Sequence, residues 1–387
     1  MRKMCYVYYL LYYAFCRFLS VFARHLPFYK DLWLTAERKT EARDNGYHFF
    51  RYMRTVHPEV NCAFIIDSSS PDYKKVSDLG KIIQPRTFRH MLAFACAKVC
   101  VSTHYMSCAY DTYGFAVLNR FGLIRKKSAL IRHGITSNDL TELHYPNARV
   151  DILVCSAVPE YESMVKNYGH PDGVVQRLGL CRYDRLMSPH EEKRRILVMP
   201  TWRYFLRELP EEEFAKSEYY RQFYSLINNE ELNRAMEKHD YTLTLYLHYE
   251  LRRYSKLFKT DNPRIEIASP GTADIQDLLM ESCFLVTDYS SVYFDFAYMG
   301  KPLLYLPFDE DKFYKTQYKK GYFDCHADGF GPVFADSCPA AEYIAEKISG
   351  GMKNDEAYRQ RADAFFGSRC ANHCELTYNA VTKLINR

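Results

Sequence analysis

The sequence lacks the patterns that identify several common nucleotide enzymes. It has no Walker phosphate-binding loop and no GxGxxG fingerprint, which argues against kinase-like and nicotinamide-dependent enzymes. It has no zinc-finger or RNA-binding motif, and a net charge of +5 is too small to indicate a nucleic-acid partner. It also contains no internal repeat and no low-complexity segment. Its function therefore has to be inferred from individual polar residues on an ordinary globular fold.

The cysteines give no sign of a disulfide framework. Thirteen are present, an odd number, and their spacing does not repeat, which is typical of a protein from a reducing cytoplasm. The stretch CANHC (370–374) could suggest a metal clamp, but it lacks a matching second pair of ligands. We therefore expect no metal site and no cofactor.

Length and composition predict two globular domains. The chain has 387 residues, of which 48% are hydrophobic, 26% charged and 16% aromatic, with 34 tyrosines against two tryptophans. Short apolar runs alternate with helical patterns, which is typical of parallel α/β sheets. The fold class expected from this alternation is α/β, with two doubly wound, Rossmann-like domains facing a central cleft.

The expected strands fall into two sets. Those of the first half are 62–67, 81–83, 98–103, 128–134, 151–156 and 174–180, and those of the second half are 196–202, 241–248, 264–269, 284–286 and 303–308. The charged, turn-rich stretch 181–195 is the best linker between the sets. This predicts a first domain over 31–185 and a second over 186–387, with closing C-terminal helices.

The N-terminal residues 1–30 form a separate apolar and aromatic segment. Its apolar run extends from Cys5 to Phe22 and is broken by Arg17. A signal peptide is disfavoured because no small-residue cleavage site follows, and the run is marginal for a spanning helix. An amphipathic helix lying in a membrane interface fits the pattern better. The alternative is an ordinary buried helix of the first domain.

The stretch TDYSS (287–291) places polar residues between two apolar runs. Asp288 is expected at the carboxyl end of a buried parallel strand, where open α/β sheets bind ligands. Ser290 is expected to be the N-cap of the next helix, with Ser291 in its first turn. A turn and a cap do not by themselves explain both serines, or Asp295 on the helix stripe that should face the sheet.

Other polar side chains follow the expected strands in the same way. They are His104, His133, Thr201, Arg203 and His248. Because the carboxyl ends of parallel strands share one edge, we expect these residues to gather at the cleft.

These residue types predict an anion site with a candidate base. A strand-end histidine can accept a proton or bind an anion, and His133 and His248 supply one in each half. Taken singly, such a histidine is more often structural. Arg203 offers a planar fork suited to phosphate, and Ser290 and Ser291 offer hydroxyl and backbone donors. No DxD pattern accompanies these strand ends, which weakens a metal-dependent sugar transferase.

Four motifs in a fixed order carry a family resemblance. They are RHG (132–134), MPTWR (199–203), LYLHYE (within 244–250) and DIQDLLMESCFLVTDYSSVYFDFAYMGKPLLYLPFD (274–309). Together they resemble the CDP-glycerol glycerophosphotransferases, which include the teichoic-acid primases and polymerases of bacteria. The resemblance covers about residues 60–310. It implies a GT-B-type fold and peripheral attachment to the cytoplasmic face of the cell membrane.

The resemblance also implies a reaction. An alditol phosphate such as glycerol phosphate would pass from a CDP-activated donor to a hydroxyl of a lipid-linked glycan or polymer, releasing CMP, in teichoic-acid or capsule synthesis. His133 would be the general base and His248 would hold the donor pyrophosphate. The other donor-binding residues implied are Thr201, Arg203, Asp288, Ser290, Ser291 and Asp295.

Two other functions remain open at this stage. A GT-B nucleotide-sugar glycosyltransferase of cell-surface glycan synthesis would have the same architecture. A membrane-associated scaffold without activity would not need the histidines. The sequence also leaves open a homo-oligomer and the identity of the alditol and the acceptor.

Overall fold

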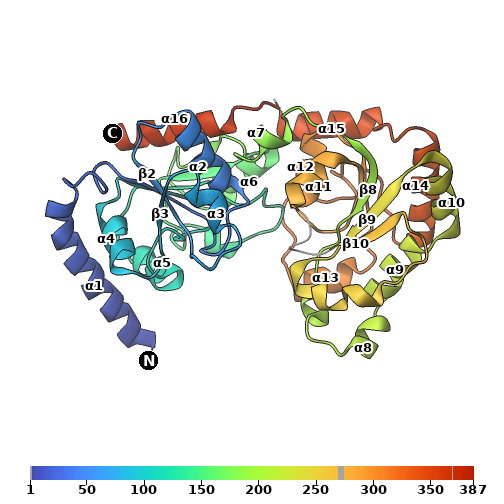
Figure 1. The fold of residues 1–387 in the computed structure, drawn as a ribbon, viewed down its shortest axis with the longest axis horizontal. Coiled ribbons are helices and arrows are strands. Elements are labelled where there is room, and N and C mark those ends of the chain that lie inside the picture. The colour runs from blue at the N-terminus through green and yellow to red at the C-terminus, as the bar shows by residue number, and fades with distance from the viewer. Residues whose placement is uncertain (1, 269–273, 368) are drawn as a thin grey trace. The chain divides into compact units, whose positions relative to one another are not determined.

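The computed structural model describes residues 2–268, 274–367 and 369–387. These residues form two compact units (Figure 1). The first unit contains the residues up to 135, with 140–185 and 370–387, and the second contains 136–139 and 186–369. Each unit has its own parallel sheet and its own buried core.

The first unit is built on a seven-stranded parallel sheet in the order β3-β2-β1-β4-β5-β6-β7. Its strands are β1 (Trp33–Ala36), β2 (Cys62–Ile65), β3 (Lys81–Ile83), β4 (Val99–Ser102), β5 (Ser128–Leu130), β6 (Ile152–Cys155) and β7 (Val175–Arg177). Its helices are α1 (Arg2–Ala23), α2 (Asn45–Thr55), α3 (Tyr73–Ser77), α4 (Phe88–Cys96), α5 (Thr112–Arg120), η1 (Thr141–Leu143), α6 (Val158–Asn167), α7 (Tyr183–Leu186) and α16 (His373–Asn386). All six predicted strands of this half are present, and the central strand β1 is an addition.

Strand β1 escaped prediction because of its position next to the apolar N-terminal segment. Its four residues, 33–36, follow the N-terminal helix closely and precede a charged stretch, so no clear strand pattern stands out. In the sheet all four are buried, and they pair in parallel with β2 on one side and β4 on the other. The strand that organises this sheet is thus the one with the weakest local signal.

Helix α1 presents one face to the core of the first unit. Tyr13 and Cys16 are buried, and the ring of Tyr13 packs against Phe94 and Phe115 on α4 and α5. Arg17, which interrupts the apolar run, donates from Nη1 to the carbonyl of Ala95 at the end of α4 (3.2 Å). A cation at a helix C-terminus is favourable, so this arginine is accommodated without facing the core. Residues 5–23 are also long and apolar enough, by length and composition, to cross a membrane.

The second unit is built on a five-stranded parallel sheet in the order β10-β9-β8-β11-β12. Its strands are β8 (Lys193–Val198), β9 (Thr242–Tyr246), β10 (Ile265–Ala268), β11 (Ser282–Thr287) and β12 (Leu303–Tyr305). Its helices are η2 (Tyr204–Leu206), α8 (Glu211–Ala215), α9 (Glu218–Ile227), α10 (Glu230–His239), η3 (Tyr249–Leu257), α11 (Ile275–Glu281), α12 (Val292–Tyr298), α13 (Glu310–Thr316), α14 (Ser337–Ser349) and α15 (Glu356–Phe366). The strand–helix–strand unit predicted around TDYSS is present as β11, α12 and β12, while residue 269 of the predicted 264–269 strand lies outside the described residues.

The last helix, α16, belongs to the first unit, whereas the sequence grouped residues 370–387 with the second. The carboxylate of Asp184 caps it by accepting from the backbone N–H groups of His373 (2.7 Å) and Cys374 (2.9 Å). Lys127 donates to the carbonyl of Leu384 near its other end (2.8 Å). These contacts join residues about 190 and 257 positions apart, which no local pattern could indicate.

Candidate active site

The polar residues of the second unit gather where its strand order reverses. Strands β8, β9 and β10 extend to one side and β11 and β12 to the other, so the switch point lies between β8 and β11. Ligands of open α/β sheets bind at the carboxyl ends of such strands. Thr201 and Arg203 follow β8, His248 follows β9, and Asp288 follows β11.

Asp288 joins the two central strand ends. Its side chain is buried, and Oδ1 accepts from the backbone N–H groups of Thr201 (2.8 Å) and Tyr289 (2.6 Å). Its other oxygen accepts from Nη2 of Arg203 (2.8 Å). One carboxylate therefore fixes the loop after β8 against the loop after β11.

Arg203 is fully buried, and this differs from the expectation that it grips phosphate. Nε and Nη2 donate to the two carboxylate oxygens of Asp309 (2.7 and 2.8 Å), and Nη1 donates to the carbonyl of Thr201 (2.6 Å). Burial alone would disfavour the charge, but Asp288 and Asp309 outweigh it and raise the pKa of Arg203. The guanidinium is thus a positioning group between two acids, with its donors already engaged.

Asp309 is a site residue that the sequence did not indicate. It begins the stretch DED (309–311), which has the DxD form, although no such pattern was expected near the strand ends. Its carboxylate accepts hydrogen bonds from Arg203 and from the hydroxyl of Tyr289 (3.2 Å). An aspartate neutralised in this way supports the scaffold of the site.

The two serines of TDYSS lie at the start of α12. Ser291, one residue later than predicted, is the N-cap of this helix, and its side chain makes no capping hydrogen bond. Both serines are half-buried, and within the described ranges neither hydroxyl has a hydrogen-bond partner. Asp295 is buried within α12. The hydroxyls are therefore the groups of this stretch that remain available to a ligand.

His248 lies at the end of β9, next to β8. Its Nδ1 accepts from the backbone N–H of Glu250 (3.3 Å), and its ring stacks on Trp202 with centroids 5.9 Å apart and planes 17° from parallel. An Nδ1 that accepts a hydrogen bond places the proton of the neutral ring on Nε2. The three neighbouring strands β9, β8 and β11 thus end in an oriented imidazole, an aromatic ring and the two serine hydroxyls.

The first unit has a corresponding edge with two histidines. His104 follows β4 and His133 follows β5, and their rings stack with centroids 5.2 Å apart and planes 24° from parallel. His133 reaches solvent, and His104 is half-buried with a 2.9 Å contact to the hydroxyl of Thr103. The sequence named His104 among the strand-end residues, and the structure pairs it with His133.

Both histidines are held in the neutral form. Desolvation by the surrounding protein, followed by the charges of Arg132 and Arg182, lowers the pKa of His133 to about 4. Desolvation, followed by the charge of His133, lowers the pKa of His104 to about 4. At neutral pH each ring can therefore accept a proton.

Buried polar contacts hold the backbone of His133 in place. Arg182 donates from Nη1 to the carbonyl of His133 and to Asp44 (2.8 Å). Asn45 donates to the carbonyl of Arg132 (2.8 Å) and accepts from the backbone N–H of Arg182 (2.9 Å). Arg132 itself has φ +56, a conformation that is uncommon for a residue other than glycine. No local pattern indicates these contacts, since Arg182 lies 138 residues from Asp44.

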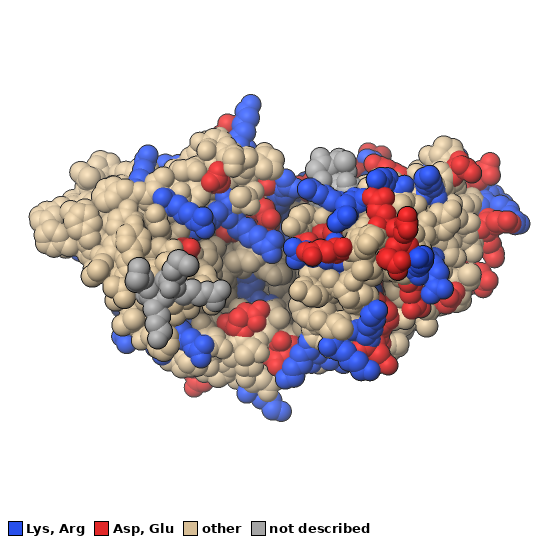
Figure 2. Space-filling view, turned by 90° about the horizontal axis from the view of Figure 1, so that it is seen from below, with Lys and Arg blue, Asp and Glu red and all other residues tan. Residues whose placement is uncertain are grey.

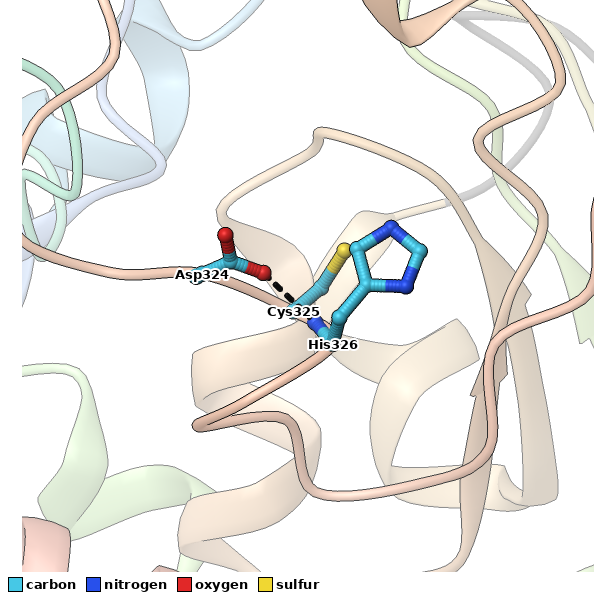
Figure 3. A group of neighbouring side chains, drawn as sticks. All are labelled: Asp324, Cys325 and His326. Atoms are coloured by element: carbon cyan, nitrogen blue, oxygen red, sulfur yellow. Dashed lines mark hydrogen bonds between the residues drawn. The ribbon is translucent and has the colours of Figure 1, made fainter.

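Three neighbouring residues could offer metal ligands. Asp324, Cys325 and His326 lie on one turn with their ligand atoms within 4.8 Å of one another (Figure 3). However, Lys320 already pairs with Asp324 (2.6 Å), and burial raises the pKa of Cys325 to about 12, which disfavours the thiolate that a metal would need. We assign this turn a structural role.

Comparison with known proteins places the chain in a family. Residues 18–383 match the family described as CDP-glycerol:poly(glycerophosphate) glycerophosphotransferase. The minor teichoic acid biosynthesis protein GgaB of Bacillus subtilis is 31% identical over 369 residues, which are 92% of this chain and 40% of GgaB. The teichoic acid poly(glycerol phosphate) polymerase of Staphylococcus epidermidis is 26% identical over 232 residues, which are 58% of this chain and 30% of that protein. The chain thus spans less than half of the length of these relatives.

Solved structures confirm the expected GT-B-like architecture. The wall teichoic acid polymerase TagF aligns with a TM-score of 0.68 and 16% identity, covering 99% of this chain and 97% of that one. The UDP-GlcNAc 2-epimerase of Neisseria meningitidis aligns with a TM-score of 0.57 and 11% identity, covering 91% and 99%. At these identities the likeness concerns the fold alone. The family match over most of the sequence carries the assignment: this chain belongs to the CDP-glycerol:poly(glycerophosphate) glycerophosphotransferase family.

Proposed function

We propose that the protein transfers glycerol phosphate, or a related alditol phosphate, from a CDP-activated donor to a hydroxyl of a polymeric acceptor in teichoic-acid synthesis. The observation that carries this proposal is the donor edge at the β8–β11 switch point, in a chain of this family. There, an oriented imidazole follows β9 and two serine hydroxyls follow β11, on either side of β8, and the hydroxyls have no partner within the described residues. Hydroxyl and imidazole N–H groups of this kind can donate to diphosphate oxygens.

The reaction is a displacement at phosphorus. A base removes the proton of the acceptor hydroxyl, and the oxygen attacks the phosphorus that carries the alditol. The bond from this phosphorus to the bridging oxygen breaks, and CMP leaves with the electron pair. Phosphoryl transfer of this kind depends mainly on positioning and charge stabilisation.

The second unit would bind the donor. Nε2–H of His248 and the hydroxyls of Ser290 and Ser291 would donate to the diphosphate oxygens. Arg203 and Asp288 would act through these groups by fixing the strand ends that present them.

The first unit would bind the acceptor, with His133 as the general base. Its neutral ring at the end of β5 is exposed to solvent, and its backbone is fixed by Arg182. His104 stacks on it and is the alternative base. Both have the neutral form that the role requires.

We further propose that α1 lies on the cytoplasmic face of the cell membrane, where the acceptor would be a lipid-linked glycan or polymer. Leu11, Phe15, Phe18 and Phe22 recur at helical spacing and are 54–66% exposed, on the face opposite the one that packs in the core. On the face drawn in Figure 2, charged side chains are sparse at the left end of the first unit and crowd the second unit. Teichoic-acid synthesis is favoured over capsule synthesis by the names of the relatives.

Point substitutions test the membrane proposal better than deletion of α1, because deletion would uncover the core around Tyr13. We expect Phe18→Glu to reduce sedimentation with vesicles of anionic phospholipid. Tyr204→Glu, at an equally exposed ring of the second unit, is the matched control. Equal sedimentation of the two variants would contradict an interface at α1.

A donor screen tests the transfer reaction itself. The purified protein is mixed with a lipid-linked acceptor and CDP-glycerol, CDP-ribitol or a UDP-sugar, and products are identified by mass spectrometry. CMP and an acceptor heavier by one alditol phosphate are expected. UDP release with sugar transfer would instead indicate a nucleotide-sugar glycosyltransferase. A protein inert towards every donor would be consistent with a scaffold.

A further inference from the structure

Three residues of the first-unit edge lie side by side in the strand register. Ala36 of β1 pairs with Ser102 of β4, and Ser102 pairs with Leu130 of β5. The residues two positions further along are Arg38, His104 and Arg132. Backbone hydrogen bonds from Thr103 to Ala36 (3.1 Å) and from Ile131 to Ser102 (2.8 Å) continue the pairing beyond the strands. Neighbouring strands are about 4.8 Å apart, so Arg38 and His104 extend from adjacent strand ends. After desolvation and the charge of His133, the charge of Arg38 contributes to the lowered pKa of His104.

Arg38 differs from the two buried arginines at this edge, Arg132 and Arg182, in being open to solvent. Arg132 is buried and pairs with Glu160 (2.8 Å), and Arg182 is buried and pairs with Asp44. The side chain of Arg38 is 63% exposed, and its ion pair in the described residues is a 3.7 Å contact to the exposed Glu41. A surface pair of this kind contributes about 0–1 kcal/mol, so it leaves the guanidinium available.

The backbone on both sides of Arg38 is anchored. Glu37 is buried, and its carboxylate accepts from the backbone N–H groups of Arg43 (2.9 Å), Asp44 (2.9 Å) and Tyr47 (2.6 Å). Lys39 donates to the carbonyls of two residues in the loop after β4, 109 and 110 (2.8 Å each). The backbone from which the Arg38 side chain extends is therefore fixed on both sides.

Gly46 is required for this arrangement. A Cβ at this position would lie 2.7 Å from Cγ of Glu37 and 3.1 Å from the carbonyl oxygen of Ala36. Glycine therefore lets the start of α2 approach the buried carboxylate closely enough for its N–H groups to bind it. Several residues thus cooperate to fix the backbone that carries one exposed cation.

The geometry points to Arg38 as the centre of a phosphate subsite beside the stacked His104 and His133. This inference rests on the proposed transfer reaction and extends it to a residue of the first unit. The ligand is a phosphate monoester or diester, which the planar fork of an arginine can bind in bidentate fashion. Its source is either the phosphate at the growing end of the acceptor or the transferred phosphate of the donor.

Direct binding tests the subsite independently of catalysis. Inorganic phosphate, and separately glycerol 3-phosphate, is titrated into the full-length protein while the ring C–H signals of His104 and His133 are followed by NMR. We expect these signals to move on titration and Arg38→Gln to weaken binding at least about 10-fold, with Arg38→Lys intermediate. Arg120→Gln is the matched control. Arg120 is exposed in the same unit at the end of α5, and this helix runs back towards the amino ends of the strands, away from the proposed subsite.

Steady-state kinetics identify the source of the phosphate. A rise in the acceptor KM of Arg38→Gln with an unchanged donor KM assigns the subsite to the acceptor, and the reverse assigns it to the donor. Phosphate affinity and both KM values unchanged from the parent would overturn the inference. Phosphate binding that depends on Arg38 in a protein inactive with every CDP donor would retain the subsite and reject the proposed reaction.

Discussion

The two sheet edges use arginine in opposite ways. In the second unit Arg203 is fully buried between Asp288 and Asp309, so its charge is neutralised inside the protein. In the first unit Arg38 is exposed beside two neutral histidines. The same topological position therefore supports a closed, charge-balanced scaffold in one unit and an open cationic edge in the other.

The difference follows from the partners that each fold supplies. At the second edge two carboxylates converge on one guanidinium, and the remaining donors for a ligand are neutral hydroxyls and an imidazole. At the first edge the buried carboxylates of Glu37 and Glu160 and the half-buried carboxylate of Asp44 bind backbone N–H groups or the buried arginines. Burial of a charge is tolerated only when it is paired, so Arg132 and Arg182 are engaged inside the protein while the exposed Arg38 remains available to a ligand.

Loss of the buried arginine should give the largest effect on stability. We expect Arg203→Met to lower the free energy of unfolding of the second unit by about 3–5 kcal/mol, because Asp288 and Asp309 would remain buried without their cation. Urea unfolding followed by tyrosine and tryptophan fluorescence measures it. Arg38→Met, as the matched exposed control, should change it by about 0–1 kcal/mol. If both variants lowered the free energy of unfolding by the same small amount, the proposed difference between a buried, paired Arg203 and an exposed Arg38 would be wrong.

Loss of the base should give the largest effect on catalysis. His133→Ala is expected to lower turnover about 10²-fold or more, as when a general base is removed, while leaving stability nearly unchanged because the ring is exposed. The turnover number is measured from the rate of CMP release with saturating donor and acceptor. His104→Ala is the internal comparison and should cost less. The reverse order of the two losses would transfer the role of base to His104.

Local patterns in the sequence predicted the parallel sheets and the strand–helix turn at TDYSS, because a buried strand and an amphipathic helix each show within a few residues. They did not predict that Arg203 is buried in an ion pair, because its partner Asp309 lies 106 residues away. They also missed Arg182 and Asp44, which meet only when the sheet has formed. Residue types at strand ends thus indicate where a site lies, while long-range pairing decides which charges remain available in it.

Donor binding should depend on the imidazole of the second edge. His248→Ala is expected to lower kcat/KM for the CDP donor about 10–100-fold, since a hydrogen bond to a charged phosphate contributes about 1.5–3 kcal/mol. His248→Asn, which keeps an N–H donor, should recover part of the loss, and Trp202→Phe should keep the stacked ring in place. A donor KM and turnover equal to those of the parent would exclude His248 from the donor site.

The serine hydroxyls should contribute less than the imidazole. Ser290→Ala and Ser291→Ala are each expected to raise the donor KM a few-fold to about 10-fold, with little change in the melting temperature, because neither hydroxyl has a partner in the described structure. Isothermal titration with the CDP donor measures the affinity. Ser225→Ala, a half-buried serine elsewhere in the same unit, is the control. A lower melting temperature with unchanged affinity would make the serines structural.

The smallest expected effect is on the pH dependence of kcat/KM, which reports on the histidines of the first-unit edge. Because the pKa of both His104 and His133 is lowered to about 4, kcat/KM is expected to stay level from pH 7 to about pH 5 and to fall below it, as the base becomes protonated. The neighbouring charges include Arg132, Arg182 and Arg38 around His133, and Asp44 and Arg38 around His104. Arg38→Gln removes a cation from both sets, so it should raise both pKa values and move the acid limb to higher pH. An acid limb near pH 6.5 in the parent, unmoved by Arg38→Gln, would mean that neither ring is the base and that Arg38 does not act at this edge.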